Sequence, residues 1–431
     1  MELFYRIPMN ENDLEKLPEF LNFSPPSLSG DELAELSDTL DSGWITKGPK
    51  TERFEKEIGS FIKTESALAV SSCTAAMHLA LRVLGVGEGD GVITSPLTFV
   101  STAHAIVYTG ATPFFCDIDP QNGNIDPRKI LRFLKYECEE YPEGILRHKK
   151  TDKIIKALLP VHYGGFPVNL SMIQTIANNF NLHILEDAAH AMGSYYKGQH
   201  IGSDSLRSNM NSGLHQLSAF SFYATKNLTT GEGGLLTGPA ELIEKARVLS
   251  AYGISDARHI WDRRYSPKGT WFYDVESLGF KNNFTDIQAA LGLAQLRNFV
   301  DNQRIRARYA EIYTDTLKPL KSLVRLPKAD DMTTPAWHLY PLRLNLSRLY
   351  ISRNEFIEKL KNLNIGTSVM FIPVHTFTYY SDLINYKKLY FPQAQRFYAC
   401  EISLPMSPKL PEEMIKKAAI LIRDLILCHA K

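Results

Sequence analysis

Short apolar runs alternate with longer amphipathic stretches between about residues 67 and 237. Most of these runs are continuous, a pattern typical of strands buried on both faces of a parallel sheet. Between them lie stretches such as 75–84, where Ala76, Leu79, Ala80 and Val83 fall on one helical face. The pattern predicts one mostly parallel seven-stranded sheet with helices on both faces, its strands at Ala67–Val70, Val92–Ser95, Thr112–Cys116, Ile154–Pro160, His183–Glu186, Ala219–Phe222 and Gly234–Thr237.

The second half of the chain predicts a smaller α/β unit. Thr285 and Asp286 form a capping pair for a helix that runs into the 290s, and the charged stretch 301–308 continues this helical connection. A last helix begins near Pro411, with acidic residues in its first turn. We therefore expect an N-terminal arm (1–25), a large domain (26–300) and a small C-terminal domain (301–431).

Composition narrows the class of protein. Of 431 residues, 44% are hydrophobic and 22% charged, and the net charge is +1. This balance excludes a disordered chain and gives no basic field for nucleic acid. No apolar run reaches the length of a membrane span, and the first 25 residues lack a signal-peptide stretch. Five cysteines without a CxxC pair argue against a disulfide framework or zinc site. We expect a cytoplasmic enzyme with no nucleic-acid, membrane or metal partner.

A lysine is the first candidate functional residue. Lys226, in SFYATKNLTTGEGG (Ser221–Gly234), follows an apolar run and precedes a loop of small residues. A sheltered lysine loses pKa and becomes nucleophilic enough to form a Schiff base. Taken alone, a solvated lysine is the commoner case at such a position.

Two further candidate binding groups, a carboxylate and a small-residue segment, lie at strand ends of the same predicted sheet. Glu186 and Asp187 end the strand in ILEDAAHA, where a carboxylate either holds a protonated ring nitrogen, caps a helix or forms a buried ion pair. SSCTAAM (Ser71–Met77) joins a strand to a helix, where it binds a phosphate or simply caps the helix. An amine, a carboxylate and a phosphate cradle at one sheet edge together indicate pyridoxal 5'-phosphate.

These and other stretches resemble the DegT/DnrJ/EryC1/StrS aminotransferases, a family of fold type I pyridoxal-phosphate enzymes that act on sugar nucleotides. The resemblance runs from about Leu40 to Pro408. It rests on stretches whose order and number match the family: SGWITKGP (Ser42–Pro49), VSSCTAAMHLAL (Val70–Leu81), SPLTFVSTAHAI (Ser95–Ile106), PVHYGG (Pro160–Gly165), ILEDAAHA (Ile184–Ala191), SFYATKNLTTGEGG, GFKNNFTDIQAALG (Gly279–Gly292), WHLY (Trp337–Tyr340), IPVH (Ile372–His375) and SLPMSP (Ser403–Pro408).

The resemblance implies a role for each matching residue. Lys226 is the Schiff-base lysine and Asp187 the partner of the pyridine nitrogen. Phe99 and His190 lie against the two faces of the cofactor ring. Thr74, Ala75 and the Ser221 hydroxyl hold the phosphate, and Asn283 reaches the phosphate of a neighbouring subunit. A homodimer with shared active sites follows from that last contact.

The implied reaction is transfer of an amino group from an amino acid, with L-glutamate expected, to a nucleotide-linked ketosugar. The DAAH stretch and the GFKNNFTD pattern favour members that act at C4 of a UDP-linked ketosugar. A family dehydratase is disfavoured, because those members replace the lysine with histidine and Lys226 is present. The alternative from another class is a non-catalytic homologue that binds the cofactor or sugar nucleotide in a regulatory role.

The chain also departs from the family pattern. Cys73 stands where many members have Gly or Ala, and Asn282 where relatives commonly have Tyr. The polar stretch Ser203–Gln216 is longer than the usual connection. The loop His259–Val275 carries Arg263, Arg264 and Lys268, which either attract a diphosphate or are simply solvated, the commoner case. His162 and His375 either face the substrate sugar or are ordinary core or loop histidines.

Overall fold

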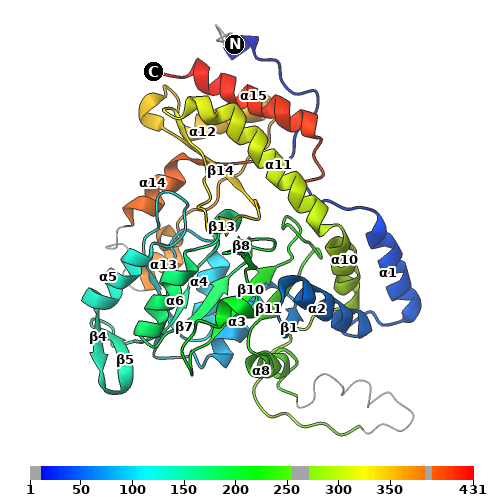
Figure 1. The fold of residues 1–431 in the computed structure, drawn as a ribbon, viewed down its shortest axis with the longest axis vertical. Coiled ribbons are helices and arrows are strands. Elements are labelled where there is room, and N and C mark those ends of the chain that lie inside the picture. Colours follow the sequence, from blue (N-terminus) through cyan, green and yellow to red (C-terminus); the bar gives the residue numbers. More distant parts are fainter. Residues whose placement is uncertain (1–10, 255–270, 384–390) are drawn as a thin grey trace.

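The computed structural model describes residues 11–254, 271–383 and 391–431, and its largest sheet has nine strands. Figure 1 shows this sheet in the lower part of the view, below α11 and α15. The strand order is β1-β11-β10-β7-β6-β2-β3, and the hairpin β4–β5 attaches to β6. The five strands from β10 to β3 are mutually parallel. The strands are β1 (Ala67–Val70), β2 (Asp90–Thr94), β3 (Thr112–Phe115), β4 (Cys138–Tyr141), β5 (Ile145–His148), β6 (Ile154–Leu159), β7 (His183–Asp187), β10 (Gln216–Ser221) and β11 (Gly234–Thr237).

All seven predicted strands are present, with ends shifted by no more than three residues. The predicted number of strands, seven, was too low, because the hairpin β4–β5 adds two strands at the side of β6. Its first strand reads Cys-Glu-Glu-Tyr and buries only Cys138. An edge hairpin without an apolar run gives no sequence signal of the kind that marks the central strands.

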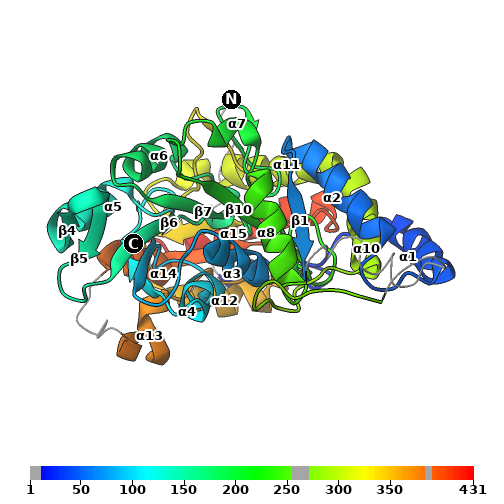
Figure 2. The ribbon, with the colours of Figure 1, turned by 90° about the horizontal axis from the view of Figure 1, so that it is seen from below.

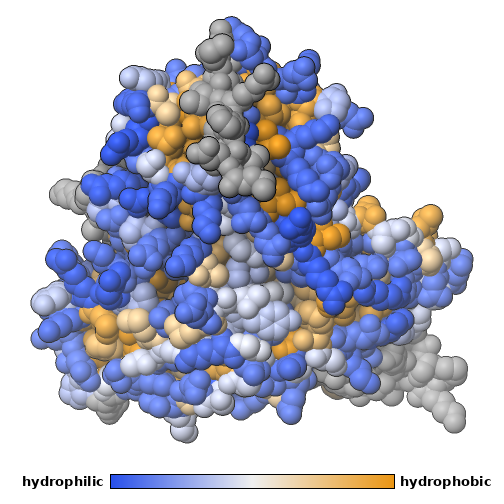
Figure 3. Space-filling view, turned by 45° about the horizontal axis from the view of Figure 1, so that its top comes forward, coloured by the Kyte–Doolittle hydropathy of each residue, from blue (hydrophilic) through white to orange (hydrophobic). Residues whose placement is uncertain are grey.

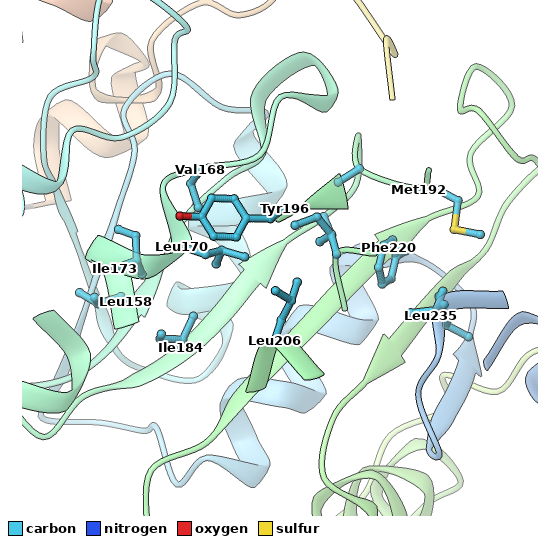
Figure 4. Packing of buried hydrophobic residues seen from close by; sticks show 14 of the residues in the cluster. Leu158, Val168, Leu170, Ile173, Ile184, Met192, Tyr196, Leu206, Phe220 and Leu235 are labelled. Carbon is cyan, nitrogen blue, oxygen red and sulfur yellow. The ribbon is translucent and has the colours of Figure 1, made fainter. Parts of the chain in front are cut away.

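Helices cover both faces of the sheet (Figure 2). Alternate residues of each strand point to opposite faces, so Ile184 of β7 joins one apolar cluster and Leu185 the other. Figure 4 shows the first cluster, where Ile173 and Leu170 pack over Ile184. Helices α2 (Pro49–Ile62), α5 (Pro127–Glu137) and α6 (Leu170–Asn179) contribute to this cluster, and α3 (Cys73–Val83), α4 (Val100–Tyr108) and α8 (Ala240–Ser250) to the other.

A second core lies around a three-stranded antiparallel sheet in the order β12-β14-β15. Leu17 and Leu21, within the predicted N-terminal arm, are buried in this core. The predicted helix after Thr285 is confirmed and begins with a capping box to Gln288. The limits at 26–300 and 301–431 stay a prediction. Elements of this part are α10 (Asp286–Arg297), α11 (Phe299–Leu317), β12 (Val324–Arg325), β14 (Tyr340–Leu344), α12 (Arg353–Asn362), α14 (Pro392–Cys400), β15 (Glu401–Leu404) and α15 (Glu412–Cys428).

The stretch Ser203–Gln216 is packed against the large sheet. It contains the short helix α7 (Asp204–Arg207), and Leu206 enters the cluster drawn in Figure 4. The Arg207 guanidinium is buried and donates to the Thr237 hydroxyl at 2.6 Å. The stretch therefore anchors to the large sheet through both apolar and polar contacts. The remaining elements are α1 (Asp31–Ser42), α13 (Thr378–Leu383) and a small sheet of β8 (Tyr195–Tyr196), β9 (Gln199–His200) and β13 (Thr333–Thr334).

Hydrophilic residues cover much of the face seen in Figure 3, with apolar residues gathered in separate patches. Within the described ranges, none of the helices has the length and apolar character needed to cross a bilayer.

Candidate active site

The parallel strands bring the predicted site residues to one edge of the large sheet. Asp187 is the last residue of β7, and Ser221 is the last residue of the neighbouring strand β10. The turn that contains Lys226 follows Ser221 directly. The carboxyl ends of parallel strands form the usual ligand edge of α/β proteins.

The Asp187 carboxylate is buried and held by two donors. Its Oδ2 accepts a hydrogen bond from Thr102 Oγ1 at 2.7 Å, and its Oδ1 accepts one from the Ala189 N–H at 3.1 Å. Burial raises the pKa of this carboxyl, whereas both hydrogen bonds and the Lys226 charge lower it. A carboxylate has about four lone-pair positions, so Asp187 retains the capacity to accept from a protonated ring nitrogen.

Lys226 presents an amine that makes no hydrogen bond within the described part of the chain. Burial lowers the pKa of this amine to about 8, while the neighbouring Cys73 and Asp187 oppose that shift. Its backbone N–H donates to the Tyr223 carbonyl at 2.9 Å, which fixes the turn. Near neutral pH a useful fraction of the amine is therefore neutral and nucleophilic.

Backbone donors stand at the start of α3. Ser72 caps this helix, and its Oγ accepts from the Ala75 N–H at 3.1 Å. The amides of Cys73 and Thr74 belong to the first turn and have no acceptor within the helix. Such a helix start attracts a phosphate. Of the two predicted phosphate binders in this turn, Thr74 thus has an open amide, whereas the Ala75 amide is bonded to Ser72.

Strand β11 packs closely against the start of α3. Ser221 of β10 lies opposite Gly234 of β11. A Cβ at Gly234 would come within 2.4 Å of the Ser72 carbonyl carbon, so only glycine lets the strand pass this close. The Ser221 hydroxyl accepts from the Tyr223 N–H at 3.4 Å and still has its own proton to donate.

The two predicted ring residues lie on segments that adjoin these groups. Phe99 precedes α4 and is 59% exposed. His190 lies in the turn after β7, where its Nδ1 accepts from the Gly164 N–H at 3.1 Å. Burial and the Lys226 charge lower the pKa of His190 well below its ordinary value, so the ring is neutral.

Asn283 lies beside the segment that joins β1 to α3 in its own chain. It pairs through its backbone with Val70, and the preceding Asn282 accepts from the Ser71 N–H at 2.9 Å. Its predicted contact with a neighbouring subunit stays a prediction. Most of the loop His259–Val275, with Arg263, Arg264 and Lys268, falls outside the described residues.

The two histidines left open by the sequence lie in the protein interior. His162 is fully buried, its Nε2 is 2.9 Å from Glu186 Oε2, and its Nδ1 accepts from the Val168 N–H. His375 is also buried and packs its ring on Phe391 at 4.7 Å. The structure therefore favours interior roles for both histidines.

Sequence reasoning missed three residues that contact the site. Thr102 lies one turn into α4, and its i, i+4 partner Thr98 lies 2.7 Å away, a spacing that was visible in SPLTFVSTAHAI. The ring of His338, from the stretch WHLY, lies 4.2 Å from that of His190 at an angle of 37°, and its Nδ1 lies 3.0 Å from Asn227 Oδ1. The ring of Phe371 contacts both Phe99 and His190, and no spacing in the sequence indicated it.

This arrangement fits pyridoxal phosphate. An amine of lowered pKa, a carboxylate with spare lone pairs and open first-turn amides lie at one sheet edge, and these are the groups needed for its aldehyde, ring nitrogen and phosphate. When bound, the cofactor supplies an electron sink for proton removal at the Cα of an amino acid.

Comparison with known proteins agrees with this fit. The sequence model of the DegT/DnrJ/EryC1/StrS aminotransferase family matches residues 26–422. The chain belongs to this family. The spore coat polysaccharide biosynthesis protein SpsC of Bacillus subtilis is 43% identical to it over 415 residues, which are 96% of this chain and 99% of that protein.

Solved members of the family share the fold. Spr1654 of Streptococcus pneumoniae, named as a sugar aminotransferase and solved in its PLP form, superposes with a TM-score of 0.79 at 29% identity over 94% of this chain and 98% of that one. Its PMP form is equally similar in fold. Helicobacter pylori PseC, an aminotransferase involved in pseudoaminic acid biosynthesis, gives 0.79 at 26% identity, covering 95% and 99%. The chain is thus a pyridoxal-phosphate-dependent aminotransferase of a sugar aminotransferase family.

Proposed function

We propose that this aminotransferase moves the amino group of L-glutamate to the keto group of a nucleotide-linked sugar, with a UDP-linked 4-ketosugar as the expected class. The observation that carries the catalytic part is the unpaired Lys226 amine near the buried Asp187 carboxylate. The names of SpsC and PseC, which concern polysaccharide and pseudoaminic acid biosynthesis, support a sugar acceptor. Glutamate leaves as 2-oxoglutarate in one half-reaction, and the ketosugar leaves as an amino sugar in the other.

In this proposal each site residue has a defined role. Asp187 keeps the pyridine nitrogen protonated. Lys226 holds the cofactor at rest and, once released, carries the proton to and from the substrate Cα. Thr74 and Ser221 hold the phosphate, and Ala75 joins them if its N–H exchanges Ser72 Oγ for a phosphate oxygen. Phe99 and His190 hold the ring.

We further propose a homodimer with shared sites. Large apolar side chains stay exposed along α1 and along 271–278, which supports a surface covered by a second copy; they include Leu33 (74% exposed), Leu40 (62%), Trp271 (80%) and Leu278 (90%). A heterodimer of two inactive variants tests whether the active sites are shared between subunits. If Asn283 serves the partner's phosphate, a heterodimer of Lys226→Ala and Asn283→Ala subunits has one intact site and regains activity. If Asn283 serves its own chain, mixing the two variants restores nothing.

The direct test supplies L-glutamate with a panel of UDP-, dTDP- and GDP-linked 4-ketosugars, and measures 2-oxoglutarate together with the mass of the sugar product. Lys226→Ala is the inactive control, and L-alanine and L-glutamine test the donor. We expect an amino sugar from the UDP-linked member. Bound cofactor without turnover for every donor and acceptor would favour the alternative, a non-catalytic homologue.

A further inference from the structure

Residues 368–374, here called the strap, run from the small sheet to the edge of the candidate site and are tied down on both sides of Phe371. Ser368 exchanges two backbone hydrogen bonds with Ser403 of β15, at 3.2 and 2.8 Å. At the other end, the Val374 N–H donates to the Pro96 carbonyl at 2.8 Å. Pro96 lies in the segment that leads to Phe99, so the strap is fixed to the same wall of the site.

The peptide groups of Met370 are held from two directions. The Met370 N–H donates to Glu401 Oε2 at 2.9 Å, and its carbonyl accepts a hydrogen bond from the Tyr163 hydroxyl. Glu401 belongs to β15 of the small sheet, whereas Tyr163 follows β6 of the large one. Both side chains are fully buried. The position of the next residue, Phe371, is thus set by both parts of the molecule.

The ring of Phe371 contacts two residues of the candidate site. Its centroid lies 6.0 Å from that of Phe99 and 5.8 Å from that of His190, with an angle of 25° to the His190 plane. Phe99 and the next strap residue, Ile372, are 59% and 45% exposed. Phe99 and the strap therefore meet at the candidate site, and the three apolar residues Phe99, Phe371 and Ile372 are here called the wall.

Glu401 is the polar support of this wall. Its Oε1 accepts from the Ser403 hydroxyl, so both carboxyl oxygens are engaged by neighbours that fix their direction. The nearest opposite charges are Arg343 and Arg353, and neither forms an ion pair with Glu401 among the described residues. The main contact of Glu401 beyond its own strand is the strap, which points to a positioning role.

We propose that the sugar ring of the acceptor packs against Phe371 and Ile372 of the wall, and that Glu401 is the positioning residue that holds them in place. The inference rests on the proposed nucleotide-sugar acceptor. A hexose ring presents C–H groups on its faces, and these pack against aromatic and aliphatic side chains, as in other ligand sites that are lined by apolar residues. The charged amino-acid donor gains little from such a wall, so the two substrates should depend on it differently.

The first test measures binding of UDP-, dTDP- and GDP-glucose, which lack the keto group, by titration calorimetry with the PMP-loaded protein. We expect Phe371→Ala to weaken the tightest of these by about tenfold. Any fall in the rate of the L-glutamate half-reaction or in the affinity for pyridoxal phosphate should be smaller than this loss of sugar affinity. Tyr136→Ala, which removes an exposed aromatic ring on α5, is the matched control and should change none of the three.

Glu401 is tested with two substitutions of similar size. Glu401→Leu removes both acceptors and should reproduce the selective loss of sugar affinity. Glu401→Gln keeps an oxygen that can accept from the Met370 N–H and should restore binding. If Glu401→Leu does not fold, Phe371→Ala still decides the question. Equal binding of the tightest sugar nucleotide by wild type and Phe371→Ala would overturn this inference alone. Binding of no sugar nucleotide by the wild type would instead contradict the proposed acceptor, and the inference with it.

Discussion

The Thr102 hydroxyl donates to the Asp187 carboxylate at 2.7 Å, although the two residues are 85 positions apart in the chain. Thr102 lies on α4, the helix that begins directly after Phe99. One helix therefore sets both the aromatic ring beside the candidate site and the donor that favours the charged form of its acid.

Thr102→Val should raise the pKa of Asp187 further above its already raised value, because a donor to the charged form is lost while burial remains. A hydrogen bond to a charged group contributes about 1.5–3 kcal/mol, and its loss disfavours the charged carboxylate by about that much. We expect the affinity for pyridoxal phosphate and kcat to fall by about tenfold or more. Fluorescence titration and steady-state kinetics measure this, with Thr102→Ser as control. Unchanged values in Thr102→Val would show that Asp187 acts without this donor.

The pH dependence of cofactor loading should report the Lys226 amine. Its pKa is lowered from 10.5 to about 8, so the neutral, nucleophilic fraction rises with pH up to about 8 and then levels off. The rate of reconstitution of the apoprotein with pyridoxal phosphate, followed by stopped-flow absorbance, should show this profile. A rate that keeps rising beyond pH 10 would mean that the amine is solvated like an ordinary lysine.

The sequence predicts the strands of the large sheet well because burial on both faces demands continuous apolar runs, as in His183–Asp187. It also points to Lys226 and Asp187, whose strand-end positions are local features. Thr102, Phe371 and Glu401 escape prediction because their partners are distant in sequence. Glu401 meets Met370 only after β15 forms, and no local pattern encodes that contact.

Asp286 links two of the stretches that match the family. Its carboxylate accepts from the N–H groups of Gly48, Lys50 and Thr51 and from the Thr51 hydroxyl, at 2.7–2.9 Å. Asp286→Ala leaves these donors unpaired and should lower the free energy of unfolding by about 3 kcal/mol. Denaturant titration measures the loss. Asp286→Asn, which keeps one acceptor oxygen, should lose less. Equal denaturation midpoints for wild type and both variants would show that these hydrogen bonds do not stabilise the fold.

The titration of Glu401 should lower the free energy of unfolding as the pH rises. Burial raises the pKa of its carboxyl from 4.5 to about 8. Between these values the folded protein binds a proton that the unfolded chain has lost, so the free energy of unfolding falls by up to about 1.4 kcal/mol per pH unit. Glu401→Gln removes this titration. Its stability relative to wild type should rise from about pH 5 to about pH 8 and then level off, as measured by urea unfolding. A constant difference would show that Glu401 titrates at its ordinary pKa.

The visible absorbance spectrum of the purified protein, before and after addition of L-glutamate, tests the central claim that Lys226 and its neighbours perform transamination. Lys226→Ala and the exposed Lys135→Ala, on α5, are measured alongside. We predict that glutamate converts the spectrum of the bound cofactor to that of its amino form in wild type and Lys135→Ala, and that Lys226→Ala shows no such conversion. Identical conversion in Lys226→Ala, or no cofactor spectrum in the wild type after reconstitution with pyridoxal phosphate, would contradict the account.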